Sequence, residues 1–224
     1  MLTYSPSLEP TRIVSEPAEV EARLRYLDPA FIQDILLEAN QRGYEDRLEA
    51  TVAHAPTAAG TFHWHGFVGA LRTAMKEKGL SIPNHKNCPL IVSADKSVAL
   101  VVMTGNSDTG KEFGNPTNQA DKGAVIDEAV QKNIQYQLFE NSAMAKLKKG
   151  ESGTQLWVLL YHVASDTKEI RSEVSLPSSF ASKKIVQWSE RILLRSIPTD
   201  PAKKAIQPLP IAPIDVFVER KRAA

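Results

Sequence analysis

The residues best suited to chemistry lie between Thr104 and Gly123, in a polar stretch rich in glycine, threonine and asparagine. Its glycines allow a ligand to approach the backbone closely, its threonines offer hydroxyl groups, and two lysines supply positive charge. The stretch follows an apolar, strand-like run and leads into a helical pattern, so free backbone N–H groups would converge at the helix start, as in anion sites. The residues that we expect to contact an anionic ligand are Thr104, Gly105, Thr109, Gly110, Lys111, Lys122 and Gly123.

The length of this stretch leaves two readings open. It exceeds the ~12–15 residues of most structureless loops, so it is either a functional segment or a flexible surface loop. A Gly-x4-Gly-Lys spacing that ends at Lys111 resembles a P-loop, but Glu112 stands where a serine or threonine would hold magnesium. Pro116 also prevents a helix from starting directly after Lys111. Nucleotide hydrolysis by a P-loop is therefore not expected.

His63 and His65 are the next candidates, because closely spaced histidines can bind a metal ion. They lie in a segment of helical periodicity, where side chains two residues apart point about 200° apart and cannot share an ion. We therefore expect no zinc site, with His63 beside the apolar face and His65 exposed. Cys88, the single cysteine, excludes a four-cysteine site and an intramolecular disulfide, and it is most simply a small buried residue. No cofactor is expected.

Acidic and aromatic residues in the last third of the chain allow further alternatives. Glu169, Glu173 and Glu190 could cluster across neighbouring strands and serve a metal-dependent nuclease, or they could form the solvated face of an antiparallel sheet. Aromatic side chains interleaved with arginines could stack single-stranded bases if they shared an exposed face, or they could pack in the core. The aromatic residues concerned are Trp157, Tyr161 and Trp188.

Apolar periodicity predicts the helices that precede and follow these residues. Four N-terminal helical patterns cover residues 16–27, 29–43, 44–56 and 61–79. Asp28 before Pro29 reads as an N-cap with proline at the first helical position, and Gly43 reads as a C-terminal stop. A further helix is predicted over 123–140, where Asn133 and Gln137 should brace the polar stretch or the adjacent sheet by structural hydrogen bonds.

Strand patterns fill the remainder of the chain. Runs at 90–93 and 98–104 predict a hairpin, and the second run lacks alternation, as in a strand covered on both faces. Alternating segments from residue 155 to 197 predict an antiparallel meander. Residues 198–213 are rich in proline and predict an extended segment, followed by a short edge strand at 214–219. The predicted fold class is therefore α+β, with a helical N-terminal half packed on a mostly antiparallel sheet, in a single domain spanning 1–224.

Composition limits the choice of partners. The 27 Lys and Arg residues nearly balance the 26 Asp and Glu residues, so an acidic partner would have to be bound by a local basic patch. The longest apolar run, Val98–Met103, falls far short of the ~20 residues needed to cross a bilayer. The first ten residues also lack the apolar region of a signal peptide. We therefore expect a cytoplasmic protein with no membrane partner.

Several short motifs between residues 60 and 220 resemble a group of uncharacterised bacterial proteins from mobile elements and accessory gene neighbourhoods. They are Met103-Thr-Gly105 with Thr109-Gly110, Lys122-Gly123, Asn133, Gln137, Trp157-Val-Leu-Leu-Tyr-His162, Glu173-Val-Ser-Leu-Pro177 and Trp188-x-Glu-Arg-Ile-Leu-Leu194. The resemblance implies mobile-element biology and assigns no activity or catalytic residue.

The sequence favours a non-enzymatic accessory or binding protein of a bacterial mobile or defence element. Such a protein would contact nucleic acid or a protein partner through residues 104–123. The alternative is a phosphate-ester hydrolase or nuclease that uses Glu173 or Glu190 near the same loop. Convergence of the loop, its lysines and two carboxylates in one pocket would favour the enzyme, whereas separated carboxylates would favour the binding protein.

Overall fold

A mixed β-sheet forms the centre of the computed structural model, which describes residues 10–140 and 153–199. Within these residues, seven strands pair in the order β1-β8-β7-β6-β5-β4, with β9 beside β7. The strands of this sheet are β1 (Arg12–Val14), β4 (Ile91–Val92), β5 (Val98–Thr104), β6 (Gln155–Ala164), β7 (Glu169–Ala181), β8 (Lys184–Leu193) and β9 (Ile197–Pro198). Two further short strands, β2 (Asn84–His85) and β3 (Cys88–Pro89), pair with each other.

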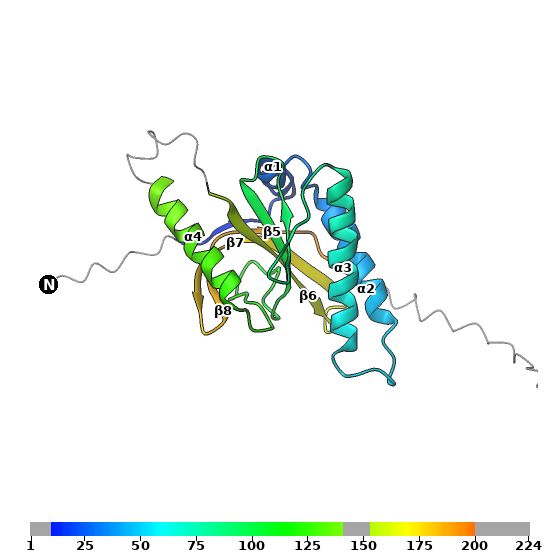
Figure 1. The fold of residues 1–224 in the computed structure, drawn as a ribbon. Coiled ribbons are helices and arrows are strands. Elements are labelled where there is room, and N and C mark those ends of the chain that lie inside the picture. Colours follow the sequence, from blue (N-terminus) through cyan, green and yellow to red (C-terminus); the bar gives the residue numbers. More distant parts are fainter. Residues whose placement is uncertain (1–9, 141–152, 200–224) are drawn as a thin grey trace, which may run out of the picture.

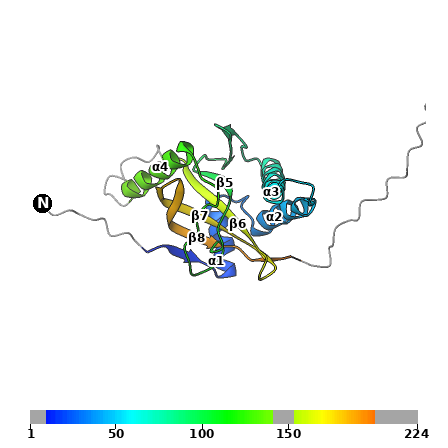
Figure 2. The same cartoon turned by 90° about the horizontal axis from the view of Figure 1, so that it is seen from below.

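Helices cover both faces of the sheet (Figure 1). Helices α1 (Pro17–Leu27), α2 (Gln33–Leu48) and α3 (Ala58–Glu77) bury their apolar stripes against one face. Helix α4 (Ala124–Glu140) packs against the opposite face, and Figure 2 shows it across the sheet from α2 and α3. The fold is therefore α+β, with N-terminal helices on a mostly antiparallel sheet, as the sequence predicts.

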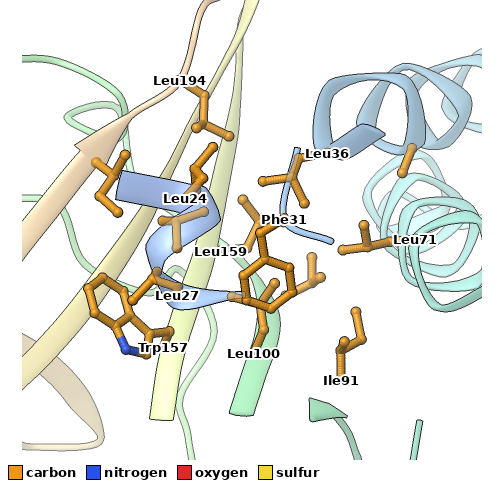
Figure 3. Close-up of a cluster of buried hydrophobic side chains, with 14 of the residues drawn as sticks. Leu24, Leu27, Phe31, Leu36, Leu71, Ile91, Leu100, Trp157, Leu159 and Leu194 are labelled. Atoms are coloured by element: carbon orange, nitrogen blue, oxygen red, sulfur yellow. The ribbon is translucent and has the colours of Figure 1, made fainter. Parts of the chain in front are cut away.

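Strand β6 contributes to both cores, because alternate side chains of a strand point to opposite faces. Trp157 and Leu159 lie in the larger core under α1–α3, which Figure 3 shows together with Leu24 and Leu100. The β6 residues that face α4 are Leu156, Val158 and Leu160. Each fully buried side chain of this size stabilises the fold by about 1.5–3 kcal/mol. Burial on both faces explains why β5 and β6 read as continuous apolar runs.

The strand pairings confirm the predicted hairpin and meander and add two parallel pairs. β4 and β5 pair antiparallel, as do β6, β7 and β8 in succession. β5 and β6 pair in parallel, as do β1 and β8, and neither pairing was predicted from the sequence. A parallel pair needs a crossover connection, which residues 105–154 with α4 provide. Consequently β5 and β6 end at the same edge of the sheet.

Helix α4 is fixed to the sheet by one amide, as predicted. The side-chain oxygen of Asn133 accepts a hydrogen bond from the backbone N–H of Leu156 at 2.9 Å, and its nitrogen donates to the carbonyl of Leu156 at 2.8 Å. Asn133 is buried, so both of its polar atoms need such partners. The side chain of Gln137 lies outside the described part of the structure.

Two of the predicted N-terminal helices are one helix, because α2 continues through Gly43. The stop predicted there is wrong. Gly43 is buried where α2 crosses α3, and an added Cβ would lie 2.5 Å from the backbone oxygen of His63. The glycine is thus needed for close helix packing rather than for helix termination.

The boundaries of the neighbouring helices also differ from the prediction. Asp28 does not cap α2, because α2 begins only at Gln33. Its carboxylate instead accepts a hydrogen bond from the N–H of Ala30 at 2.8 Å, in the turn after α1. Helix α3 begins at Ala58, earlier than predicted. From residue 10 on, three helices therefore precede the hairpin where four were predicted.

The described residues form a single folded body. Pro198 belongs to β9, whereas the rest of the predicted proline-rich segment, from residue 200 on, and the edge strand predicted at 214–219 lie outside the described residues. None of the described helices is long and apolar enough to cross a membrane.

Candidate functional site

Residues 105–120 fold back over the face of the sheet that also carries α4. Asn118 is fully buried, and its side-chain oxygen accepts a hydrogen bond from the N–H of Ile185 at 2.8 Å. The hydroxyl of Thr117 donates to the carbonyl of Ile185 at 2.8 Å, and the indole N–H of Trp188 donates to the carbonyl of Pro116 at 2.8 Å. Strand β8 therefore holds this segment against the sheet.

An acidic side chain of the protein itself occupies the predicted anion site at Gly110. The N–H of Gly110 donates to Glu173 Oε2 at 2.8 Å. Glu173 is fully buried and also accepts from Arg191 Nη2 at 2.6 Å and from the hydroxyl of Ser175 at 2.9 Å. Arg191 Nη2 donates in turn to the carbonyl of Lys111 at 2.7 Å. This ion pair thus fixes the backbone at Gly110 and Lys111, and these N–H and C=O groups are not free for a ligand.

The predicted site residues separate into two groups. Thr109, Gly110 and Lys111 lie on the Glu173 side, where Thr109 is fully buried and the side chain of Lys111 is exposed. Two others border a cleft, namely Thr104 and Lys122. The structure therefore does not bring the two lysines of the loop to one site.

The two predicted site glycines outside these groups shape the loop ends. The N–H of Gly105 donates to the carbonyl of Tyr161 at 2.8 Å, which continues the pairing of β5 with β6 by one residue. An added Cβ on Gly105 would lie 2.0 Å from the hydroxyl oxygen of Thr109, so only glycine fits. Gly123 is exposed, and its carbonyl accepts from the N–H of Ile126 in the first turn of α4.

The cleft has a volume of about 760 Å³ and lies at the carboxyl ends of the parallel strands β5 and β6. Its walls come from the end of α2, the first half of α3, the last residues of β6, and Gln119, Ala120 and Lys122. This edge of parallel strands is where open α/β sheets commonly bind ligands. The lining side chains that can carry charge, form hydrogen bonds or stack are Arg47, His63, Trp64, His65, Lys122 and His162.

The cleft is bordered by positive charge without a matching carboxylate. Among the described residues, no Asp or Glu lines it, and neither Arg47 nor Lys122 forms an ion pair. Burial lowers the pKa of Lys122, because desolvation disfavours its charged form. An anionic ligand would compensate both cations.

Two imidazoles face the cleft in their neutral forms. Burial, assisted by the nearby charge of Arg47, lowers the pKa of His63 to about 3, and burial also lowers the pKa of His162. His162 Nδ1 donates to the carbonyl of Gly105 at 3.3 Å, which leaves its Nε2 as an acceptor. At neutral pH the cleft therefore combines cationic groups with hydrogen-bond acceptors.

The two glutamates considered for hydrolysis do not converge. Glu173 lies on the α4 side of the sheet, opposite Leu160 of β6. Glu190 lies on the other face, where Arg23 of α1 donates to it at 2.7 Å. Neither the predicted cluster nor the predicted solvated face is correct for these two residues. Residues 105–111 cover Glu173, and α1 covers Glu190. The alternation of polar and apolar residues along a strand does not show that such segments cover its polar face.

The aromatic residues of the sheet pack in the cores. Trp157 and Tyr161 are buried under α1–α3, and Trp188 is buried on the opposite face. The base-stacking alternative is therefore wrong for these three residues. Trp64 borders the cleft instead, and its indole N–H donates to the carbonyl of Val102 at 3.2 Å.

The remaining candidates for chemistry lie apart from one another. His63 is fully buried and His65 is exposed, as predicted. In the part of the chain that the structure describes, no group of three or more His, Cys, Asp or Glu could hold a metal ion. Cys88 is half-buried, and burial raises the pKa of its thiol, which disfavours the reactive thiolate.

The cleft residues that sequence reasoning missed include Arg47, Gln119 and His162. The available signal was the order of strand, helix and strand from residue 98 to 164, which is typical of a parallel pair with a helical crossover. That order would have indicated a shared strand edge, although not the side chains of α2 and α3 that face it.

Comparisons with protein-family models, with curated proteins and with solved structures find no match to this chain. The functional proposal therefore depends on the geometry and charge of the cleft.

Proposed function

We propose that this chain is a non-enzymatic binding protein that holds a single nucleic-acid strand by its phosphates in the cleft at the ends of β5 and β6. The observation that carries the proposal is that Arg47 and Lys122 both line the cleft, whereas no described carboxylate does. Phosphate oxygens are strong acceptors for such cations, and they would remove the cost of leaving both charges uncompensated.

The size of the cleft favours a strand over a duplex. A volume of about 760 Å³ falls within the range of small-ligand pockets, so it accommodates a nucleotide unit and not a double helix. Trp64 and His65 line the same wall with their rings packed edge to face, and the exposed His65 offers a ring against which a base can stack. Within the 104–123 loop, residues 119–122 would make the contacts.

The other functional hypotheses have less support. A hydrolase that used Glu173 and Glu190 would need both carboxylates at one cleft, yet they face opposite sides of the sheet. A protein partner remains an outcome of the test below. A role in a mobile or defence element follows from the sequence resemblance and stays a prediction.

Fluorescence anisotropy tests the proposal with labelled single-stranded RNA, single-stranded DNA and duplex DNA at two salt concentrations. An Arg47→Ala/Lys122→Ala variant should bind single strands about tenfold more weakly, and the slope of log K against log salt should become shallower by about 1–1.5. Lys132→Ala is the control, because Lys132 is exposed on α4 and does not line the cleft. If no single strand binds at low salt, or if both variants weaken binding equally, the proposal is wrong.

A further inference from the structure

The innermost polar group of the cleft is His63, which is fully buried yet belongs to the lining. One edge of its ring faces α2. Its Cδ2 would lie 2.7 Å from a Cβ built on Gly43, and its Nε2 lies 2.9 Å from Asn40 Oδ1. Nδ1 is on the opposite edge of an imidazole, so it is turned away from α2.

The orientation of Asn40 sets the protonation of His63: its side-chain oxygen faces Nε2, while its Nδ2 has no hydrogen-bond partner within the described residues. An amide oxygen only accepts, so Nε2 is the donor, and the neutral ring leaves a lone pair on Nδ1. Within the described residues, Nδ1 has no hydrogen-bond partner. Buried acceptors are normally satisfied, and an unsatisfied one in a functional cleft indicates a partner supplied from outside the chain.

The surroundings of His63 restrict what that partner can be. Its ring lies against Tyr161 with the centroids 4.4 Å apart, and the hydroxyl of Tyr161 accepts from Thr104 at 3.2 Å. Arg47 lies close enough to influence the charge of the His63 ring. Arg47 and His63 line the same cleft, so a strand whose phosphate is bound at Arg47 would have its sugar hydroxyl as the donor nearest to that phosphate.

We propose that His63 Nδ1 accepts a hydrogen bond from a ribose hydroxyl, so that the cleft selects RNA over DNA. This inference rests on the proposed function, because the phosphate contact at Arg47 and Lys122 positions the sugar. The 2′-hydroxyl is the group that distinguishes the two nucleic acids, and it is a hydrogen-bond donor where deoxyribose has none.

The wild-type protein tests this proposal with three labelled strands of identical sequence, made of RNA, DNA and 2′-fluoro RNA. Fluorine cannot donate a hydrogen bond, so the 2′-fluoro strand separates hydrogen bonding from sugar conformation. RNA should bind about fivefold more tightly than either of the other two strands. Equal binding of RNA and 2′-fluoro RNA would overturn the proposal.

A His63→Gln variant gives a second test. Glutamine can keep a polar group near the Nε2 position, facing Asn40, but it removes the acceptor at Nδ1. The variant should bind RNA and DNA with equal affinity, which means that the preference for RNA is lost, and an unchanged Tm would show that it is folded. A retained preference would refute the assignment to His63.

The outcomes also separate this inference from the proposed function. If all three strands bind equally in a Lys122-dependent way, the cleft binds nucleic acid and only the hydroxyl contact is wrong. If no strand binds, both proposals fail.

Discussion

Removing the carboxylate of Glu173 should be among the most destabilising single changes in this protein. The Glu173 side chain is fully buried and that of Arg191 is almost so, and they are joined at 2.6 Å. A Glu173→Met variant would leave a buried guanidinium without its counter-ion and the N–H of Gly110 without its acceptor. Breaking a buried pair in this way costs about 3–5 kcal/mol. For a domain of this size, that loss lowers Tm by roughly 6–20 °C.

Thermal and urea unfolding of five proteins would test this reasoning. They are the wild type, Glu173→Met, Arg191→Met, the double variant and a control. The double variant should be more stable than Glu173→Met alone, because the uncompensated buried cation is gone. Glu19→Gln is the control, since the Arg12–Glu19 pair is largely exposed and contributes less than about 1 kcal/mol. A loss below about 1 kcal/mol for Glu173→Met, or additive single losses, would refute the argument.

Three further predictions concern the loop, the cleft and α4. Gly110→Ala should cost about 1–3 kcal/mol in urea unfolding, because φ is +71° and the new Cβ would lie 2.7 Å from Arg171 Cβ, whereas Gly123→Ala, in open space, should be neutral. The pKa of His63, about 3 in the fold and ~6.5 unfolded, means that the unfolded chain binds more protons as pH falls. The free energy of unfolding should therefore fall by up to about 1.4 kcal/mol per pH unit as the pH is lowered from about 6 to 4. His63→Phe should show a weaker dependence of this free energy on pH, and the same dependence as in the wild type would contradict the prediction. Asn133→Ala should cost about 2–4 kcal/mol and speed hydrogen exchange at the Leu156 amide, and unchanged exchange would contradict the brace.

Features set by neighbours in sequence were predictable. Alternation located β6, β7 and β8, and the place of Asn133 near an apolar stripe indicated a structural hydrogen bond. Gly43 shows why such reasoning also fails. A glycine near the end of an apolar pattern fits a helix stop and a close helix crossing equally well, and only the position of α3 decides between them.

The candidate site was harder to predict because it depends on which surfaces are covered. Glu173 alternates with apolar residues as a solvated residue would, but residues 105–111 cover its face of the sheet. The residues predicted to bind an anion lie in two places for the same reason. Glu173 accepts a hydrogen bond from the N–H of Gly110, whereas Lys122 lines the cleft. Neither Arg47 nor His162 has a chemical role that its neighbours in sequence indicate, and only the fold brings them to one cleft.

The bonds that hold residues 105–120 also impose an order on how the chain matures. The partners of Gly110 and Lys111 lie 63 and 80 residues further along, in β7 and β8. During synthesis, the helices α1–α3 leave the ribosome long before those strands, so we expect the cleft wall at 119–122 to form last. Pulse-labelled hydrogen exchange during refolding would show this as late protection of the Ile185 amide. A nascent or prematurely terminated chain would thus carry α2 and α3 without the opposite wall of the cleft.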